Sequence, residues 1–397
     1  MPDRKTNIIF LLFFILLCSS CGDRIRFDRL LKEAETLSVS NPDSAMRLME
    51  DAEFLILGDA EFSRWCMLWG KIEEMREQSE YDFVPFLSIA RWTRAKNYFD
   101  KKGTEEERAW IRVYLGRSYK ENDSNYNGAL ETYKEALEYA VKAESYHTAG
   151  IICSYMADLY MDRHLYDEAR KQYEANAEYQ KKCGNRRSLA IALNNIGFCY
   201  ACEEDFEKGL DFVGQADSVA NSITDSMVMG TIYNTYGAIY EEIGEMDLAE
   251  NYYFRSIMMD STECEPTYLG LSTLYAQKGD NEKSKTYLNQ AMSEWTQSAV
   301  MHQYYLMAKE ERRTDTALFY LERYEEMSDS IRTEQDKMHI VEIDRRYDKT
   351  RIISEKNNLS ITIQRLYTAG LTLLLAIIAA FYIYHKYVRR QIGKRKI

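Results

Sequence analysis

Turn-forming residues are scarce in this chain, which contains 4 Pro and 18 Gly among 397 residues. An all-β protein of this length needs many tight turns, and such turns draw on these two residue types. Helix-forming Ala, Leu, Glu and Lys are instead plentiful. The composition therefore excludes a β-rich fold and predicts an all-α chain, either several domains or one extended repeat array.

Signatures of catalysis are also missing. The sequence has no G-x-G-x-x-G, Walker loop, G-x-S-x-G or H-E-x-x-H motif. Acidic pairs such as Glu241 with Glu242 are typical of a solvated helix face. The five histidines lack metal-ligand spacing: His147, His164, His302, His339 and His385. We therefore predict no enzymatic activity, no cofactor and no bound metal.

Cysteine chemistry has little support in the sequence. Among the 8 cysteines, Cys199 and Cys202 form a C-x-x-C, which is found in redox pairs and in half-sites for zinc. No second C-x-x-C or nearby His pair completes a metal set, and the motif lies inside a helical pattern, not at a helix start. We interpret both cysteines as small core residues.

The end of the chain carries a cluster of positive charge without acids. The net charge is -12, and nucleic-acid binding needs clustered Lys and Arg, so the body of the chain is not expected to bind nucleic acid. The last twelve residues have no acid and six bases: Lys386, Arg389, Arg390, Lys394, Arg395 and Lys396.

An apolar run near the N-terminus predicts a signal peptide over residues 1–20. Ile8 to Cys18 follow two basic residues and are too few to span a bilayer. The sequence "LCSSCGD" resembles the lipobox of bacterial lipoproteins, although Cys18 stands where Leu is usual. The resemblance implies acylation of Cys21. The alternative is an ordinary cleaved signal peptide in which Cys21 is unmodified.

A second apolar run predicts a transmembrane helix over residues 366–384. These 19 residues carry no charge and have tyrosines at both ends, as interfacial aromatics do. Because basic residues flanking a membrane helix tend to remain in the cytoplasm, residues 385–397 are predicted to be a cytoplasmic tail. The rest would then be periplasmic, attached to the bacterial inner membrane.

An internal repeat occupies the middle of the sequence. Its first half places a tyrosine three residues after a small residue: Gly116 and Tyr119, Ala157 and Tyr160, Gly197 and Tyr200, Gly237 and Tyr240, Ser272 and Tyr275. Its second half places a large residue four after a small one: Ala129 and Tyr133, Ala169 and Tyr173, Gly209 and Val213, Ala249 and Tyr253, Ser284 and Leu288. A degenerate sixth copy has Ala308 in place of the tyrosine. The two halves predict two antiparallel helices whose backbones approach closely at the small residues.

This pattern resembles the tetratricopeptide repeat (TPR), whose helix pairs stack into a right-handed superhelix. The resemblance covers residues 105–325, with degenerate repeats expected over 26–104. It departs from the family in lacking the closing proline and in its period, since the tyrosines lie 41, 40, 40 and 35 residues apart. The whole chain resembles bacterial envelope proteins in which exported repeats precede a helical stalk and one membrane span.

The predicted stalk covers residues 326–365. Its apolar residues share one seven-residue register, interrupted by Arg345: Ile331, Met338, Ile352, Leu359 and Leu366. Two interpretations stay open, a lone solvated helix and a weak coiled coil that joins two copies of the chain.

Ligand contacts are expected on the first helices, which line the concave groove of such a solenoid. The candidates are the positions that helix packing leaves free: Asp158, Asn194, Phe198 and Asn234. Asn194 and Asn234 are equivalent positions 40 residues apart, and an Asn amide can donate to and accept from a peptide backbone at once. The alternative is that these are polar residues on a wet surface.

Together these features predict a membrane-anchored TPR scaffold that binds a protein or peptide, as a sensory or regulatory component without an output domain of its own. The alternative is a glycan-binding outer-membrane lipoprotein, since carbohydrate platforms use exposed aromatics and the chain has 31 Tyr.

Overall fold

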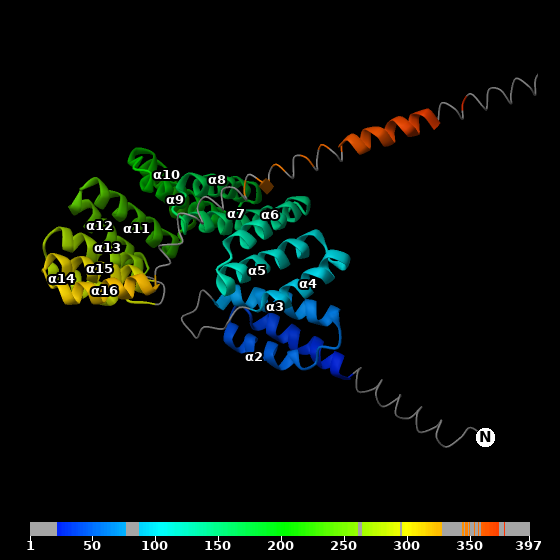
Figure 1. The fold of residues 1–397 in the computed structure, drawn as a ribbon, viewed down its shortest axis with the longest axis horizontal. Helices are drawn as coiled ribbons and strands as arrows, with labels where there is room; N and C mark the ends of the chain where they lie inside the picture. Colours follow the sequence, from blue (N-terminus) through cyan, green and yellow to red (C-terminus); the bar gives the residue numbers. More distant parts are fainter. Residues whose placement is uncertain are drawn as a thin grey trace, which may run out of the picture. The chain divides into compact units, whose positions relative to one another are not determined.

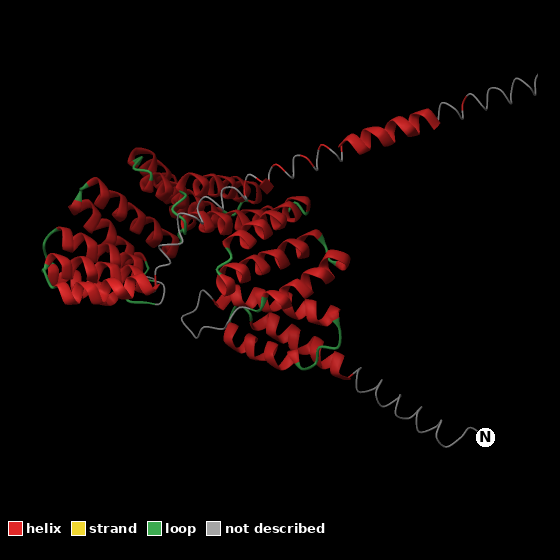
Figure 2. Ribbon diagram, viewed as in Figure 1, coloured by secondary structure: helices red, strands yellow, loops and turns green. Residues whose placement is uncertain are grey.

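The computed structural model describes residues 22–76, 87–260, 264–293, 296–327 and 359–372, together with residues 344, 346, 347, 349, 353, 356 and 377. By its contacts the chain divides into two units, Met1–Ile340 and Val341–Ile397. Every regular element in the described residues is a helix (Figure 2). The predicted all-α, TPR-like fold is confirmed.

The first unit is a series of helices that follow one another along the chain (Figure 1). A helix over residues 22–37 comes first. The others are α2 (Pro42–Glu53), α3 (Asp59–Arg76), α4 (Ile89–Lys102), α5 (Glu105–Asp123), α6 (Tyr126–Lys142), α7 (Tyr146–Met161), α8 (Tyr166–Cys183), α9 (Arg186–Cys202), α10 (Phe206–Ile223), α11 (Ser226–Ile243), α12 (Met246–Met259), α13 (Glu265–Gln277), α14 (Asn281–Gln290), α15 (Gln297–Glu310) and α16 (Thr314–Met327).

The helices from α5 onward form pairs, as the repeat predicts. Each of α5, α7, α9, α11, α13 and α15 packs along the helix that follows it. We call these the first helices and their partners the second helices. Neighbouring pairs are joined by contacts of α6 with α7, α8 with α9, α10 with α11 and α12 with α13.

Local sequence fixes where the helices begin and end. The side chains of Asn185, Asp205 and Asp225 each accept a hydrogen bond from a backbone N–H in the first turn of the following helix. Gly184 and Gly244 end α8 and α11 in the left-handed conformation, which glycine adopts without strain. Short polar turns therefore separate α5 to α16, whose lengths run from 10 to 19 residues.

The start of α5 carries a complete capping box, and its removal by mutation should lower the stability of the protein. The Thr104 hydroxyl accepts from the Glu107 N–H at 3.2 Å, and the Glu107 carboxylate accepts from the Thr104 N–H at 2.8 Å. We expect Thr104→Ala to lower the free energy of unfolding by ~1 kcal/mol, measured by urea denaturation. Ser88 makes no such bond at the start of α4, so Ser88→Ala is the control, and an equal loss in both variants would contradict the assignment.

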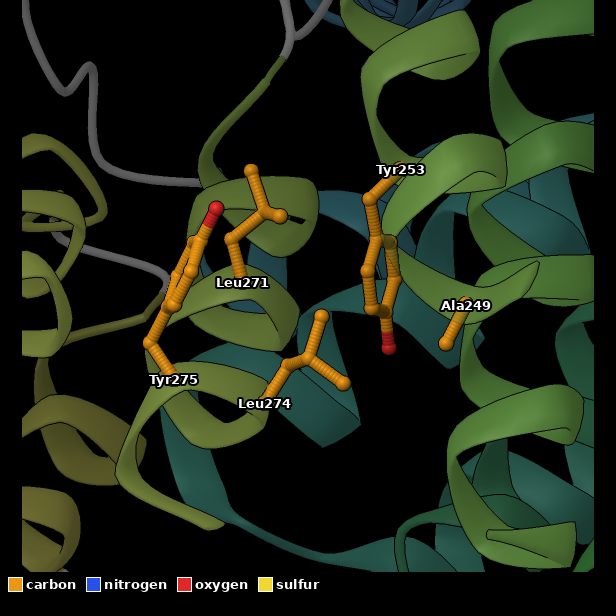
Figure 3. Close-up of a cluster of buried hydrophobic side chains, with 5 residues drawn as sticks. All are labelled: Ala249, Tyr253, Leu271, Leu274 and Tyr275. Carbon is orange, nitrogen blue, oxygen red and sulfur yellow. The ribbon is translucent and has the colours of Figure 1, made fainter. Parts of the chain in front are cut away.

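Small residues and tyrosines build the core between pairs. Tyr253 of α12 lies between Ala249 and the leucines Leu271 and Leu274 of α13 (Figure 3). A Cβ added at Gly237 or Gly270 would lie 2.5 or 2.6 Å from the Tyr253 ring, so both glycines are required by the packing of that ring. Burial of each such large side chain contributes ~1.5–3 kcal/mol.

The described part of the chain gives no support to the predicted membrane anchor. None of its helices combines the length and the apolar character needed to cross a bilayer. Of the predicted span 366–384, only residues 366–372 and 377 are described. The predicted inner-membrane location, with a periplasmic repeat domain, depended on that span and is corrected here.

Several predicted segments lie outside the described residues. These are the signal peptide at 1–20, the lipidation site Cys21 and the tail at 385–397. Most of the stalk at 326–365 lies outside them as well, and in its described part Leu359 and Ile363 are exposed. Dimerisation through the stalk stays a prediction.

Candidate functional site

In most successive pairs the first helices approach one another directly. Contacts join α5 with α7, α9 with α11, α11 with α13, and α13 with α15, whereas second helices form no comparable contacts in the described residues. Two side-chain bonds mark this seam: Lys120 to Asp162 at 2.9 Å, and Gln277 to Glu241 at 3.1 Å. The first helices therefore lie on the inner side of the stack.

The inner face of α7, α9, α11 and α13 is defined by spacing from the small residue of each first helix. We count from this small residue, which is Ala157, Gly197, Gly237 or Ser272. The inner face consists of the residues six and three positions before the small residue and one, four and five positions after it, which share one side of a helix. They are Ile151, Ser154, Asp158, Met161 and Asp162; Ile191, Asn194, Phe198, Ala201 and Cys202; Thr231, Asn234, Ala238, Glu241 and Glu242; and Pro266, Leu269, Thr273, Ala276 and Gln277. All four predicted contact residues belong to this face.

Asn194 and Asn234 have unsatisfied amide oxygens. Asn194 is only 3% exposed, and Asn234 is half-buried. The Oδ1 atoms of both residues are buried and accept no hydrogen bond. Leaving a buried acceptor unpaired costs ~1–3 kcal/mol, so two such atoms at equivalent positions of contacting helices indicate a place where a ligand donates.

Phe198 lies one turn after Asn194 and is 38% exposed. The equivalent residue in α11 is Ala238, which is much smaller. An exposed ring beside two amides offers an apolar contact next to polar ones, a combination typical of peptide recognition.

Asp158 is already engaged within the protein. Its Oδ1 accepts a hydrogen bond of 2.7 Å from the Tyr173 hydroxyl of α8. Burial raises the pKa of Asp158, and this bond and the Lys120 ammonium oppose the rise. Asp158 is therefore partly satisfied before any ligand binds.

Glu241 was misinterpreted from the sequence. It is not part of a solvated face, since only 8% of it is exposed. Its carboxylate accepts from the Tyr253 hydroxyl at 2.7 Å and from the Gln277 amide at 3.1 Å. Burial, with a smaller contribution from Glu242, raises the pKa of Glu241 to about 7 even though the Tyr253 bond opposes the shift. Lys120 and Glu241 occupy equivalent positions, each four residues after the small residue of its first helix. This shared position is the sequence signal that could have identified Glu241 as a residue in contact with the next first helix.

The C-x-x-C cysteines show no sign of activation. Cys199 is buried, and burial raises the pKa of its thiol to about 12 and that of Cys202 to about 11. Thiols with raised pKa values are poor nucleophiles at neutral pH. In the described residues, no group of His, Cys, Asp or Glu is arranged to hold a metal ion.

The helix pairs, their seam and the inner face define an all-helical protein of the TPR-like class. Three solved structures share this fold. Apo RapI has a TM-score of 0.53 and 14% identity, and the match covers 67% of this chain and 96% of RapI. NprR in complex with its cognate peptide NprX has a TM-score of 0.51 and 14% identity, and the match covers 82% of this chain and 97% of NprR. Aspartyl phosphate phosphatase F from Bacillus subtilis has a TM-score of 0.50 and 13% identity, and the match covers 76% of this chain and 93% of the phosphatase. The model of the family described as cohesin loading factor matches residues 167–396, more than half of the 397 residues, and the chain belongs to that family.

Curated relatives match over shorter stretches. The 43 kDa receptor-associated protein of the synapse from Tetronarce californica is 23% identical over 145 residues, which is 36% of this chain and 35% of the relative. Response regulator aspartate phosphatase A of Bacillus subtilis is 26% identical over 119 residues, 30% of this chain and 32% of the relative. The chain therefore matches about a third of the length of each relative.

Proposed function

We propose that this protein is a helical-repeat scaffold whose inner face binds an extended peptide or an extended segment of a partner protein. The pair of unsatisfied amide oxygens at Asn194 and Asn234 carries this proposal. NprR, a structure of the same fold, contains its cognate peptide, so the fold is compatible with such a ligand. Holding a protein partner is also compatible with the description of the family.

The amides fit a peptide backbone better than other ligands. A backbone in extended form presents an N–H and a C=O to each side, and an Asn side chain pairs with both. Because Asn194 and Asn234 belong to successive first helices, two such pairs of hydrogen bonds would hold a ligand that runs across α9 and α11. Side chains of the ligand would then meet Phe198 on one side and Ala238 on the other.

A second function, glycan binding, is less well supported by the contacts. A glycan platform needs free aromatic faces, but the repeat tyrosines stack on rings within the protein, with centroids 5.5 Å apart for Tyr200 and Phe212 and 5.4 Å apart for Tyr240 and Tyr252. Absence of enzymatic activity stays a prediction.

A pooled library of random octapeptides tests the proposal. The full chain is immobilised, and retained peptides are identified by mass spectrometry and resynthesised for affinity measurement. We expect wild-type protein to retain peptides and the Asn194→Ala/Asn234→Ala double variant to bind them on the order of 100-fold more weakly, since about four hydrogen bonds of ~0.5–1.5 kcal/mol each are lost.

The matched control removes two exposed amides from second helices, with Asn221→Ala on α10 and Asn251→Ala on α12. This double variant should bind like the wild type. Retention of no peptide by the wild type, or equal affinity of both double variants, would overturn the proposal.

A further inference from the structure

The inner face carries charge of one sign. Among its twenty residues, four are acidic, Asp158, Asp162, Glu241 and Glu242, and none is Lys or Arg. They lie on α7 and α11, which flank α9 with its unpaired Asn194. A face of one sign in a site of reduced solvent exposure attracts ligands of the opposite sign.

Cations of the protein neutralise only one end of this face. Lys120 of α5 pairs with Asp162 at 2.9 Å and also lies near Asp158. Glu241 has only neutral donors, Tyr253 from α12 and Gln277 from α13, and its charged neighbour is another acid, Glu242. From α9, the thiol of Cys202 lies near Glu242. The acids of α11 are therefore uncompensated by any of these groups.

The unsatisfied atoms of the face are acceptors. Asn194 is 3% exposed, and its unpaired Oδ1 indicates, separately from the acidic residues, that a ligand donates a hydrogen bond to this face. The Oδ1 of Asn234, on the next first helix, is unpaired as well. Backbone N–H groups would satisfy the amides, and ammonium or guanidinium groups would satisfy the carboxylates.

We infer that the segment bound by the inner face is basic, with a Lys or Arg side chain placed against Glu241 and Glu242. This inference rests on the proposed function, because the amide pair supplies the backbone contacts that position that side chain. It excludes acidic segments, which would meet like charge.

Titration provides a second signature. Burial raises the pKa of Glu241 to about 7. A bound cation stabilises the ionised carboxylate and lowers this pKa, so binding near neutral pH releases protons. Affinity for a basic peptide should then rise with pH through about 7, and added salt should weaken it.

Three octapeptide libraries test the inference on the full-length protein. They are random at six positions and have two fixed Lys, two fixed Gln or two fixed Glu. We expect peptides with Lys to bind about tenfold more tightly than those with Gln at low salt, as partly exposed ion pairs allow, and peptides with Glu to be retained least. Isothermal titration in buffers of different ionisation enthalpy should show proton release with the Lys peptides at pH 7.

Replacing the inner-face carboxylates with amides of the same shape tests whether they cause the preference for Lys peptides. The variant Asp158→Asn/Glu241→Gln/Glu242→Gln keeps acceptors for Tyr173 and Tyr253, and it should lose the preference for Lys while still binding the Gln peptides. The control Glu131→Gln/Glu207→Gln/Glu282→Gln removes three exposed acids from second helices and should keep the preference.

Failures of the two proposals can be told apart. Retention of no library by the wild type would sink the proposed function. Retention of all three libraries without a preference for Lys, or a preference that survives in the inner-face variant, would overturn the inference of a basic partner while leaving peptide binding in place.

Discussion

Replacing Gly197 with alanine is expected to lower the free energy of unfolding by about 2–3 kcal/mol, although alanine is the better helix former. Gly197 of α9 faces Gly209 of α10 where the two helices cross. An added Cβ would lie 2.6 Å from a methyl carbon of Val213 and 2.8 Å from the Gly209 carbonyl oxygen. A backbone oxygen cannot rotate away, so the two helices must separate and lose packing along the whole pair.

Gly214 supplies the matched control for this prediction. It lies in α10, the partner of α9, but a Cβ there would be 3.4 Å from the Tyr236 hydroxyl, an ordinary contact. Gly214→Ala should therefore raise stability by up to ~1 kcal/mol, because glycine in a helix is destabilising relative to alanine. Urea denaturation followed by circular dichroism measures both, and similar losses in the two variants would argue against a close crossing at Gly197.

Replacing Glu241 with glutamine is expected to stabilise the protein at pH 8 by roughly 3 kcal/mol, since each unit of pKa shift corresponds to about 1.4 kcal/mol. The pKa of Glu241 is raised from 4.5 to about 7 in the folded protein. The folded state therefore binds more protons than the unfolded state between these values, and the wild type loses stability as pH rises from about 4.5 to about 7. Glutamine cannot ionise, so the variant lacks this loss.

The difference between variant and wild type isolates the contribution of this one group. It should be small at pH 4.5, grow up to about pH 7 and stay constant above that value. Tyr253 can still donate to the glutamine oxygen, and the Gln277 amide can turn to accept from its nitrogen. A constant difference at all pH values would refute a protonated, buried Glu241.

Much of the fold is predictable because its determinants are local. The spacing of small residues and tyrosines predicts each helix pair, since the same few residues cap, cross and fill every pair. Second-helix positions such as Ala169 and Tyr173 are buried as that pattern requires. Position alone also places Asn194 and Asn234 on the inner face, because residues three before the small residue share one side of the helix with the other positions of that face.

What the local pattern could not reveal depends on hydrogen-bond partners on other helices, in the same pair or in the next one. Asp158 was expected to be free, yet it accepts from Tyr173, and Glu241 was expected in water, yet it is buried beside Gln277 of the next pair. The predicted membrane location was drawn from one apolar run and is not supported by any described helix.

The sequence by itself determined an all-α repeat of helix pairs, because helical periodicity is written into successive residues, and from that periodicity it predicts the face on which ligand contacts should lie. Only the tertiary structure decided which polar groups on that face are satisfied and which are left with unpaired oxygens. Burial and hydrogen bonding depend on residues far away in the sequence, such as Tyr253 and Gln277, which lie 12 and 36 positions from Glu241. Their geometry is set when the two helices of a pair pack together and when one pair packs against the next.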